Sequence, residues 1–99
     1  MNKDEIISIL NDNLSTLKNK YGISKIGIFG SYSKNTQTDN SDIDLIIKFE
    51  KPIGLKYFEL IDFLEEKLGK NVDVIIEKGL EQIRIKSVSD SIRNEITYV

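Results

Sequence analysis

Two aspartates, Asp42 and Asp44, interrupt an apolar run that continues through residues 45–47. In a β-strand, residues two positions apart project from the same face, so the two carboxylates would lie together. Neighbouring carboxylates repel each other unless a cation lies between them, and oxygen ligands suit a hard divalent ion such as Mg2+. Because Mg2+ usually shares its coordination shell with water and substrate phosphates, the pair indicates a protein that handles phosphate groups.

A glycine and a serine precede this pair at a spacing that strengthens the interpretation. Gly30-Ser31 is followed by ten residues and then by Asp42-Ile43-Asp44. A glycine lets the backbone approach a ligand closely, and a following helical turn points its N–H groups at an anion. The alternative is that the aspartates are the solvated face of an amphipathic strand and that Gly30-Ser31 is an ordinary turn.

This spacing of glycine, serine and two aspartates resembles the signature of the DNA polymerase β-like nucleotidyltransferase superfamily. Within the superfamily, the chain is most similar to the minimal nucleotidyltransferases, many of which are MntA-type antitoxins paired with a HEPN-domain toxin. The resemblance extends from Ile23 to the end of the chain and implies a third carboxylate at Asp73. It also implies an α+β fold of the polymerase β-like nucleotidyltransferase type, with a small mixed sheet of three to four strands covered by helices.

The resemblance implies transfer of AMP from ATP to a hydroxyl, expected to be a tyrosine of a HEPN ribonuclease toxin, with two Mg2+ ions. Asp42, Asp44 and Asp73 would hold the metal ions, and Asp73 is the candidate base that accepts the proton of the acceptor. Gly30 and Ser31 would bind the β and γ phosphates. A tyrosine acceptor is chemically reasonable because a phenol loses its proton more readily than an alcohol does.

The turn after Ser31 departs from the family pattern at two positions. Lys34 stands where an arginine is common, and it offers phosphate a point charge in place of a two-pronged contact, so triphosphate affinity is expected to be weak. Asn35 stands where a glycine is frequent, but asparagine tolerates a left-handed backbone better than most residues. Lys34 could instead be a solvated loop residue, and Ser33 could either bind phosphate or satisfy the local backbone.

Other functions compete with this one. A binding antitoxin could keep the fold and neutralise its toxin by occupation alone, and another transferase could use a small-molecule acceptor. A calcium-binding loop starting at Asp39 is rejected, because the glycine required at its sixth position is missing.

Composition agrees with a single domain over residues 1–99. The net charge is −2, with acidic and basic residues interspersed, which argues against nucleic acid as a standing partner. The chain contains no cysteine and no histidine, so neither disulfides nor a zinc site is indicated. We find no apolar stretch near 20 residues and no leader pattern, and we therefore expect a cytoplasmic protein without membrane insertion.

Apolar spacing predicts the elements that position these residues. One helix is expected over residues 2–20, closed by Gly22, and a second over residues 54–68, closed by Gly69. Strands are expected at residues 23–29, 41–49 and 71–76, with a short helical turn and a loop between the first two. Residues 77–99 have a mixed period, which suggests one or two short helices and an extended end from residue 95.

Overall fold

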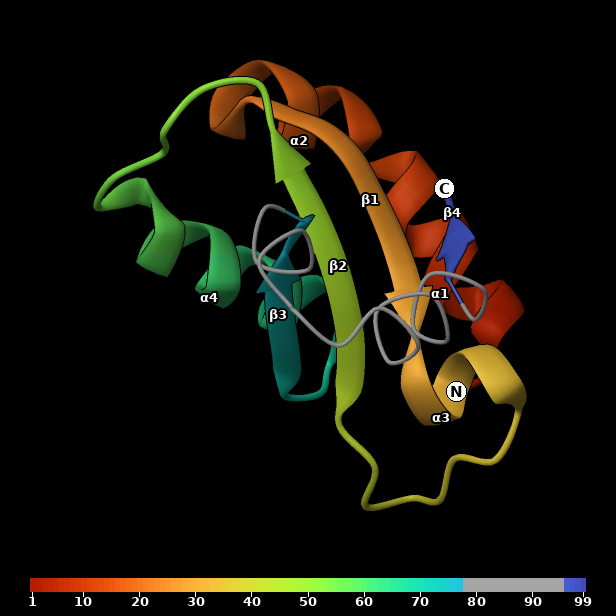
Figure 1. Cartoon of the computed structure of the whole chain (residues 1–99). Coiled ribbons are helices and arrows are strands. Elements are labelled where there is room, and N and C mark those ends of the chain that lie inside the picture. Colours follow the sequence, from red (N-terminus) through yellow and green to blue (C-terminus); the bar gives the residue numbers. More distant parts are fainter. Residues whose placement is uncertain (78–95) are drawn as a thin grey trace, which may run out of the picture.

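The computed structural model describes residues 1–77 and 96–99 of the chain. Helices and strands alternate irregularly along the described residues (Figure 1). The elements are α1 (Lys3–Asp12), α2 (Leu14–Tyr21), β1 (Ile23–Phe29), α3 (Gly30–Lys34), β2 (Ile43–Phe49), α4 (Lys56–Leu68), β3 (Val72–Ile76) and β4 (Thr97–Tyr98).

The four strands form one sheet in the order β3-β2-β1-β4. β1 is antiparallel to both of its neighbours, β2 and β4, whereas β2 and β3 run parallel. The parallel pair is connected through α4, which supplies the long crossover that parallel neighbours require. This mixed sheet with its helices confirms the expected α+β fold class.

One side of the sheet, here called the core face, packs against α1, α2 and α4, which lie behind the sheet in Figure 1. Alternate residues of β2 point to this face, so Ile43, Leu45 and Ile47 are fully buried. The other buried members of the core cluster are Ile6, Leu10, Leu17, Tyr21, Ile23, Ile26, Ile28, Tyr32, Leu60, Leu64 and Leu68.

The opposite side, here called the carboxylate face, carries Asp44 and Ile46 of β2. Ile46 is only 1% exposed although it lies outside the core cluster. Gly27 of β1 pairs with Ile46, and a Cβ on this glycine would lie 2.7 Å from the Ile96 side chain and 3.1 Å from that of Tyr98. The absent side chain at Gly27 therefore lets the end of the chain pack closely on β1.

The expected single helix over residues 2–20 is wrong, because the structure forms two helices that meet at Asn13. The backbone of Asn13 has φ −107° and ψ 6°, and its side-chain amide donates a 2.8 Å hydrogen bond to the carbonyl of Ile9. Asparagine side chains compete with the backbone for such carbonyls, and this competition ends α1. The apolar stripe itself was predicted correctly, since both helices bury residues from it.

The helix ends expected at Gly22 and Gly69 are confirmed. α2 and α4 are each followed by a left-handed glycine, Gly22 with φ 68° and Gly69 with φ 71°. α4 begins at Lys56, two residues later than expected. β4 confirms the extended end, whereas the predicted helices before it lie outside the described residues. Within the part of the chain that the structure describes, no helix could span a membrane.

The helix–sheet contact predicts the effect of truncating Leu64, which is 1% exposed. Leu64→Ala should lower the free energy of unfolding by about 2–5 kcal/mol, because it removes buried apolar atoms and leaves a cavity. Leu55→Ala, at a position 86% exposed, should change it by less than about 0.5 kcal/mol. Urea unfolding measures both variants, and equal effects would contradict this packing.

Candidate active site

The turn that follows β1 has the geometry of an anion-binding turn. Gly30 has φ 73° and begins α3, which ends at Lys34. Among the described residues, no side chain caps the N-terminus of α3. Backbone N–H groups in the first turn of a helix have no acceptor within the helix and can bind an anion.

The far end of α3 is held in place by several contacts. Asn35 adopts the left-handed conformation expected for it, with φ 60°, and Thr36 donates its backbone N–H to the Ser31 carbonyl at 2.9 Å. Tyr32 is buried in the core, and its hydroxyl donates to the Ser41 carbonyl at 3.5 Å. These contacts fix the turn relative to both the core and the loop before β2.

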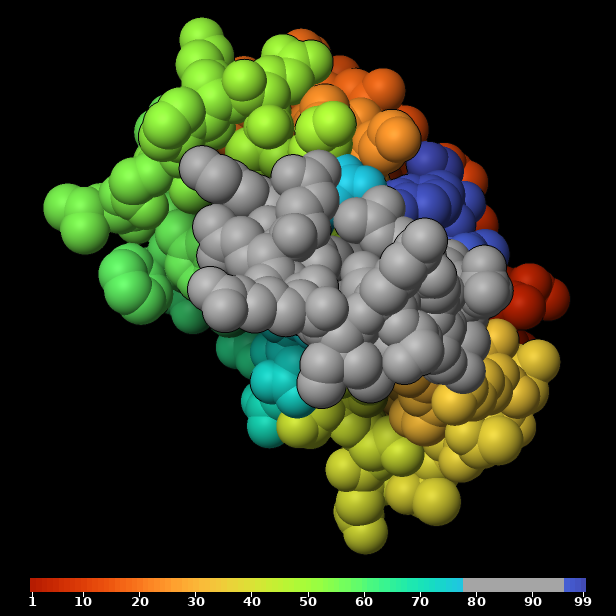
Figure 2. Space-filling model, viewed as in Figure 1, coloured from red at the N-terminus to blue at the C-terminus, as the bar shows by residue number. Residues whose placement is uncertain are grey.

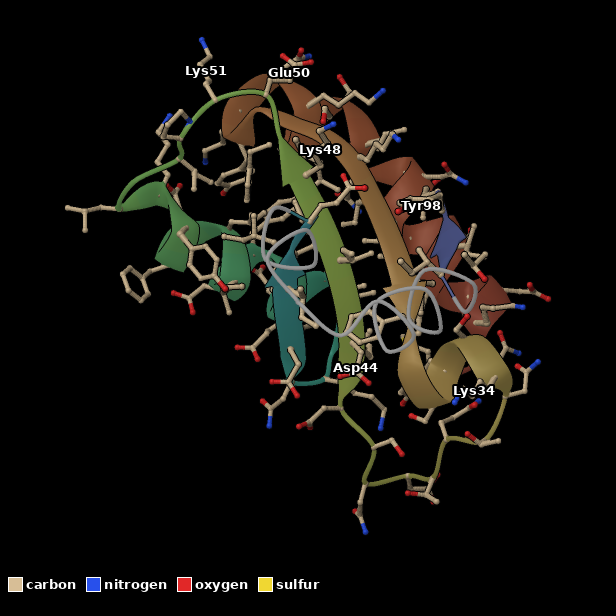
Figure 3. The ribbon with its side chains drawn as sticks, in the orientation of Figure 1. Lys34, Asp44, Lys48, Glu50, Lys51 and Tyr98 are labelled. Atoms are coloured by element: carbon tan, nitrogen blue, oxygen red, sulfur yellow. The ribbon has the colours of Figure 1, made fainter. Side chains whose placement is uncertain are left out.

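The three aspartates identified in the sequence lie at the same end of the sheet. In the parallel pairing of β2 with β3, Asp44 is the direct partner of Asp73, so both side chains project from the carboxylate face. Asp42 immediately precedes β2, two positions before Asp44. Phe29, the last residue of β1, pairs with Asp44 from the other side, which brings the turn at Gly30 next to the carboxylates. Figure 3 shows Asp44 and Lys34 at this end.

Gly30 and Asp44 approach each other so closely that no side chain fits at position 30. A Cβ on Gly30 would collide with the carboxylate oxygen Oδ2 of Asp44. This contact could not be predicted alongside the phosphate-binding role of Gly30, because nothing in the local sequence signals which residue of β2 faces the turn. The glycine therefore leaves the space that the Asp44 carboxylate occupies.

Asp44 is the carboxylate with a perturbed proton affinity at this end of the sheet. Partial burial raises the pKa of its carboxyl above the ordinary value, and the negative charges of Asp73 and then Asp42 raise it further. Asp44 therefore lies close enough to Asp73 and Asp42 to be affected by their charges. A cation bound beside Asp44 would relieve the repulsion.

The donor set fits Mg2+ only if the substrate supplies part of the coordination shell. Within the described residues, no three carboxylate, histidine or cysteine side chains converge into a ready-made metal site. Mg2+ commonly binds through one or two carboxylates and takes its other ligands from water and substrate phosphates. Asp42 and Asp44, next to a turn that can bind phosphate, satisfy that requirement, and Asp73 lies beside them.

The remaining predicted residues lie on α3 or at its end. Lys34 is exposed as the last residue of α3. Ser33 is hydrogen-bonded to Thr97, with 3.2 Å between the two hydroxyl oxygens. Thr97 was not among the predicted residues, because its neighbours in sequence give no sign of a contact with residue 33.

Comparison with known proteins gives a family match over most of the chain. The family described as nucleotidyltransferase domain matches residues 8–99. A protein of Methanocaldococcus jannaschii, named as a candidate protein adenylyltransferase, is 44% identical over 96 residues, which cover 96% of this chain and 95% of the relative. Protein adenylyltransferase MntA of Thermococcus cleftensis is 34% identical over 97 residues, covering 97% and 94%.

Solved structures agree with these matches. A structure described as a candidate minimal nucleotidyltransferase superposes with a TM-score of 0.76 at 26% identity, covering 98% of this chain and 95% of the other. A crystal structure of a toxin–antitoxin with AMP-PNP superposes with a TM-score of 0.63 at 26% identity, covering 99% and 72%.

The raised pKa of Asp44 predicts that Asp44→Asn stabilises the metal-free protein at neutral pH. The folded state holds this proton more tightly than the unfolded chain, so ionisation costs stability as the pH rises above the ordinary aspartate pKa of about 3.9. The asparagine variant avoids that cost. Its melting temperature in EDTA should exceed that of the wild type near neutral pH, and the difference should vanish below about pH 3.5.

Asp62→Asn is the matched control, because Asp62 is an exposed carboxylate of α4. It should shift the melting temperature little at any pH. An Asp44→Asn variant that melts at or below the wild-type temperature throughout the range would contradict the argument.

Proposed function

Because the chain belongs to the nucleotidyltransferase domain family and is a nucleotidyltransferase, we propose that it transfers AMP from ATP to a protein hydroxyl. Relatives that match nearly its whole length are named protein adenylyltransferases, which favours a protein as the acceptor. The single observation that carries the proposal is the register of β2 and β3, which sets Asp44 beside Asp73, next to the turn at Gly30.

The partner is proposed to be a HEPN-domain toxin, and the acceptor one of its tyrosine hydroxyls. Support comes from the similar relative named MntA and from the toxin–antitoxin structure that holds AMP-PNP. In this proposal residues 1–99 act as one domain, in the cytoplasm, and silence the toxin by modifying it.

The proposed reaction is a displacement at the α-phosphorus of ATP. The acceptor oxygen forms a bond to this phosphorus, the bond to the bridging oxygen of the β-phosphate breaks, and pyrophosphate leaves. Asp73 accepts the proton of the acceptor hydroxyl. The backbone N–H groups after Gly30 and the hydroxyl of Ser31 bind the β and γ phosphates, and Lys34 adds positive charge at the C-terminal end of α3.

Asp42 and Asp44 are proposed to hold Mg2+, with Asp73 sharing a second ion. When bound, the two ions neutralise negative charge on the phosphate oxygens. The protein's own contribution is to orient these carboxylates toward one face. It does so through the pairing of β2 with β3, which sets Asp44 beside Asp73, while Asp42 immediately precedes β2.

The direct test is transfer of labelled AMP from ATP, with Mg2+, to a co-purified HEPN toxin. The wild type should label the toxin, and the double variant Asp42→Asn, Asp44→Asn should lower the rate by about 100-fold or more, because it removes the charges that hold the cations. Asp62→Asn should leave the rate unchanged. Mass spectrometry of the labelled toxin identifies the acceptor residue.

Two other outcomes would replace the proposal. If neither wild type nor variant labels the toxin while both bind and neutralise it, the chain is an antitoxin that acts by binding alone. If label from ATP appears on a small molecule and not on protein, the acceptor class is wrong.

The contact between Gly30 and Asp44 predicts a second effect on activity. Gly30→Ala should lower AMP transfer by at least about 10-fold, because its Cβ displaces the Asp44 carboxylate. Gly22→Ala is the matched control: Gly22 has a similar φ of 68°, but a Cβ there would meet nothing within 4 Å. Both variants should lose stability in thermal unfolding through the strained backbone, Gly30→Ala more than Gly22→Ala because of the added collision, and equal transfer rates would show that the contact is unimportant.

A further inference from the structure

We propose that Thr97 is a positioning residue for the phosphate-binding turn and that it acts through Ser33. The two hydroxyl groups form a partly buried hydrogen bond of 3.2 Å between residues 64 positions apart in sequence. The inference rests on the proposed function, because that function assigns the turn beginning at Gly30 to the triphosphate.

Thr97 lies where it can restrain the turn directly. It belongs to β4, a strand of two residues, and pairs with Ile28, which lies two positions before Gly30. In Figure 1, α3 and β4 lie on the same side of β1. The hydrogen bond therefore connects the short helix to the sheet at the point where β1 ends.

The turn depends on such restraints because α3 has only five residues. A helix of this length does not persist without tertiary contacts. Tyr32 anchors α3 in the core, and the Ser31 carbonyl accepts hydrogen bonds from Thr36. Ser33 adds a third restraint, its hydrogen bond to Thr97 of β4.

Loss of this restraint should affect nucleotide binding more than the chemical step. The N–H groups of α3 point in one direction as a set, and a turn that moves must be ordered again when phosphate binds, which costs affinity. Asp42 and Asp44 belong to or adjoin β2, which is held by its own pairing with β1 and β3. The KM for ATP should therefore rise while kcat stays nearly constant.

The test compares Thr97→Val, which keeps the shape of the side chain without the hydroxyl, with Ser33→Ala, the double variant and Thr97→Ser. Calorimetry with Mg2+ and AMP-PNP should give about 3- to 10-fold weaker binding for each hydroxyl-free single variant. The double variant should bind no more weakly than either single variant. Thr97→Ser, which restores a hydroxyl, should bind like the wild type.

Transfer assays on the same variants should show a raised KM for ATP with kcat within about two-fold of the wild type. If Thr97→Val binds AMP-PNP as tightly as the wild type, the proposal is wrong. It is equally wrong if Ser33→Ala weakens binding far more than Thr97→Val, since Ser33 would then contact the nucleotide itself. A wild type that binds AMP-PNP but transfers no label overturns the proposed function and leaves the binding comparison to decide the role of Thr97.

Discussion

The parallel register of β2 and β3 is the constraint on which the candidate site depends. It sets Asp44 directly beside Asp73; partial burial raises the pKa of the Asp44 carboxyl, and repulsion from Asp73 raises it further. A shift of either strand by one residue would turn one of these side chains to the core face. The register is protected against such a shift because Ile43, Leu45 and Ile47, which alternate with Asp44 along β2, bury their side chains against the helices.

Repulsion between the aspartates on the carboxylate face therefore destabilises the folded state, and apolar burial on the core face offsets this effect. Leu45 and Ile47 are fully buried on one side of the same strand that presents Asp44 on the other. Gly30 adds a second cost, since a left-handed glycine without a side chain loses much conformational freedom on folding. Both features destabilise the empty protein, and both belong to the arrangement of Asp44 at the candidate site, which is the common trade between stability and activity at functional sites.

Much of this arrangement could be predicted from sequence because it follows from local pattern. Strand periodicity predicted that Ile43, Leu45 and Ile47 point away from Asp44, and the closing glycines Gly22 and Gly69 marked the helix ends correctly. The prediction of one helix over residues 2–20 failed at Asn13, where a side chain competes with the backbone and the helix divides into α1 and α2. It also could not show that Gly30 faces Asp44 or that Ser33 meets Thr97, since both contacts depend on which strands pair and in which register.

The strand order also indicates on which side of β2 the leaving group departs and on which side the acceptor approaches in the proposed reaction. The turn after β1 lies on one side of β2, and Asp73 of β3 lies on the other. A displacement at phosphorus needs the entering and leaving oxygens roughly in line. With pyrophosphate leaving toward the turn at Gly30, the acceptor hydroxyl has to approach over β3, where Asp73 can take its proton.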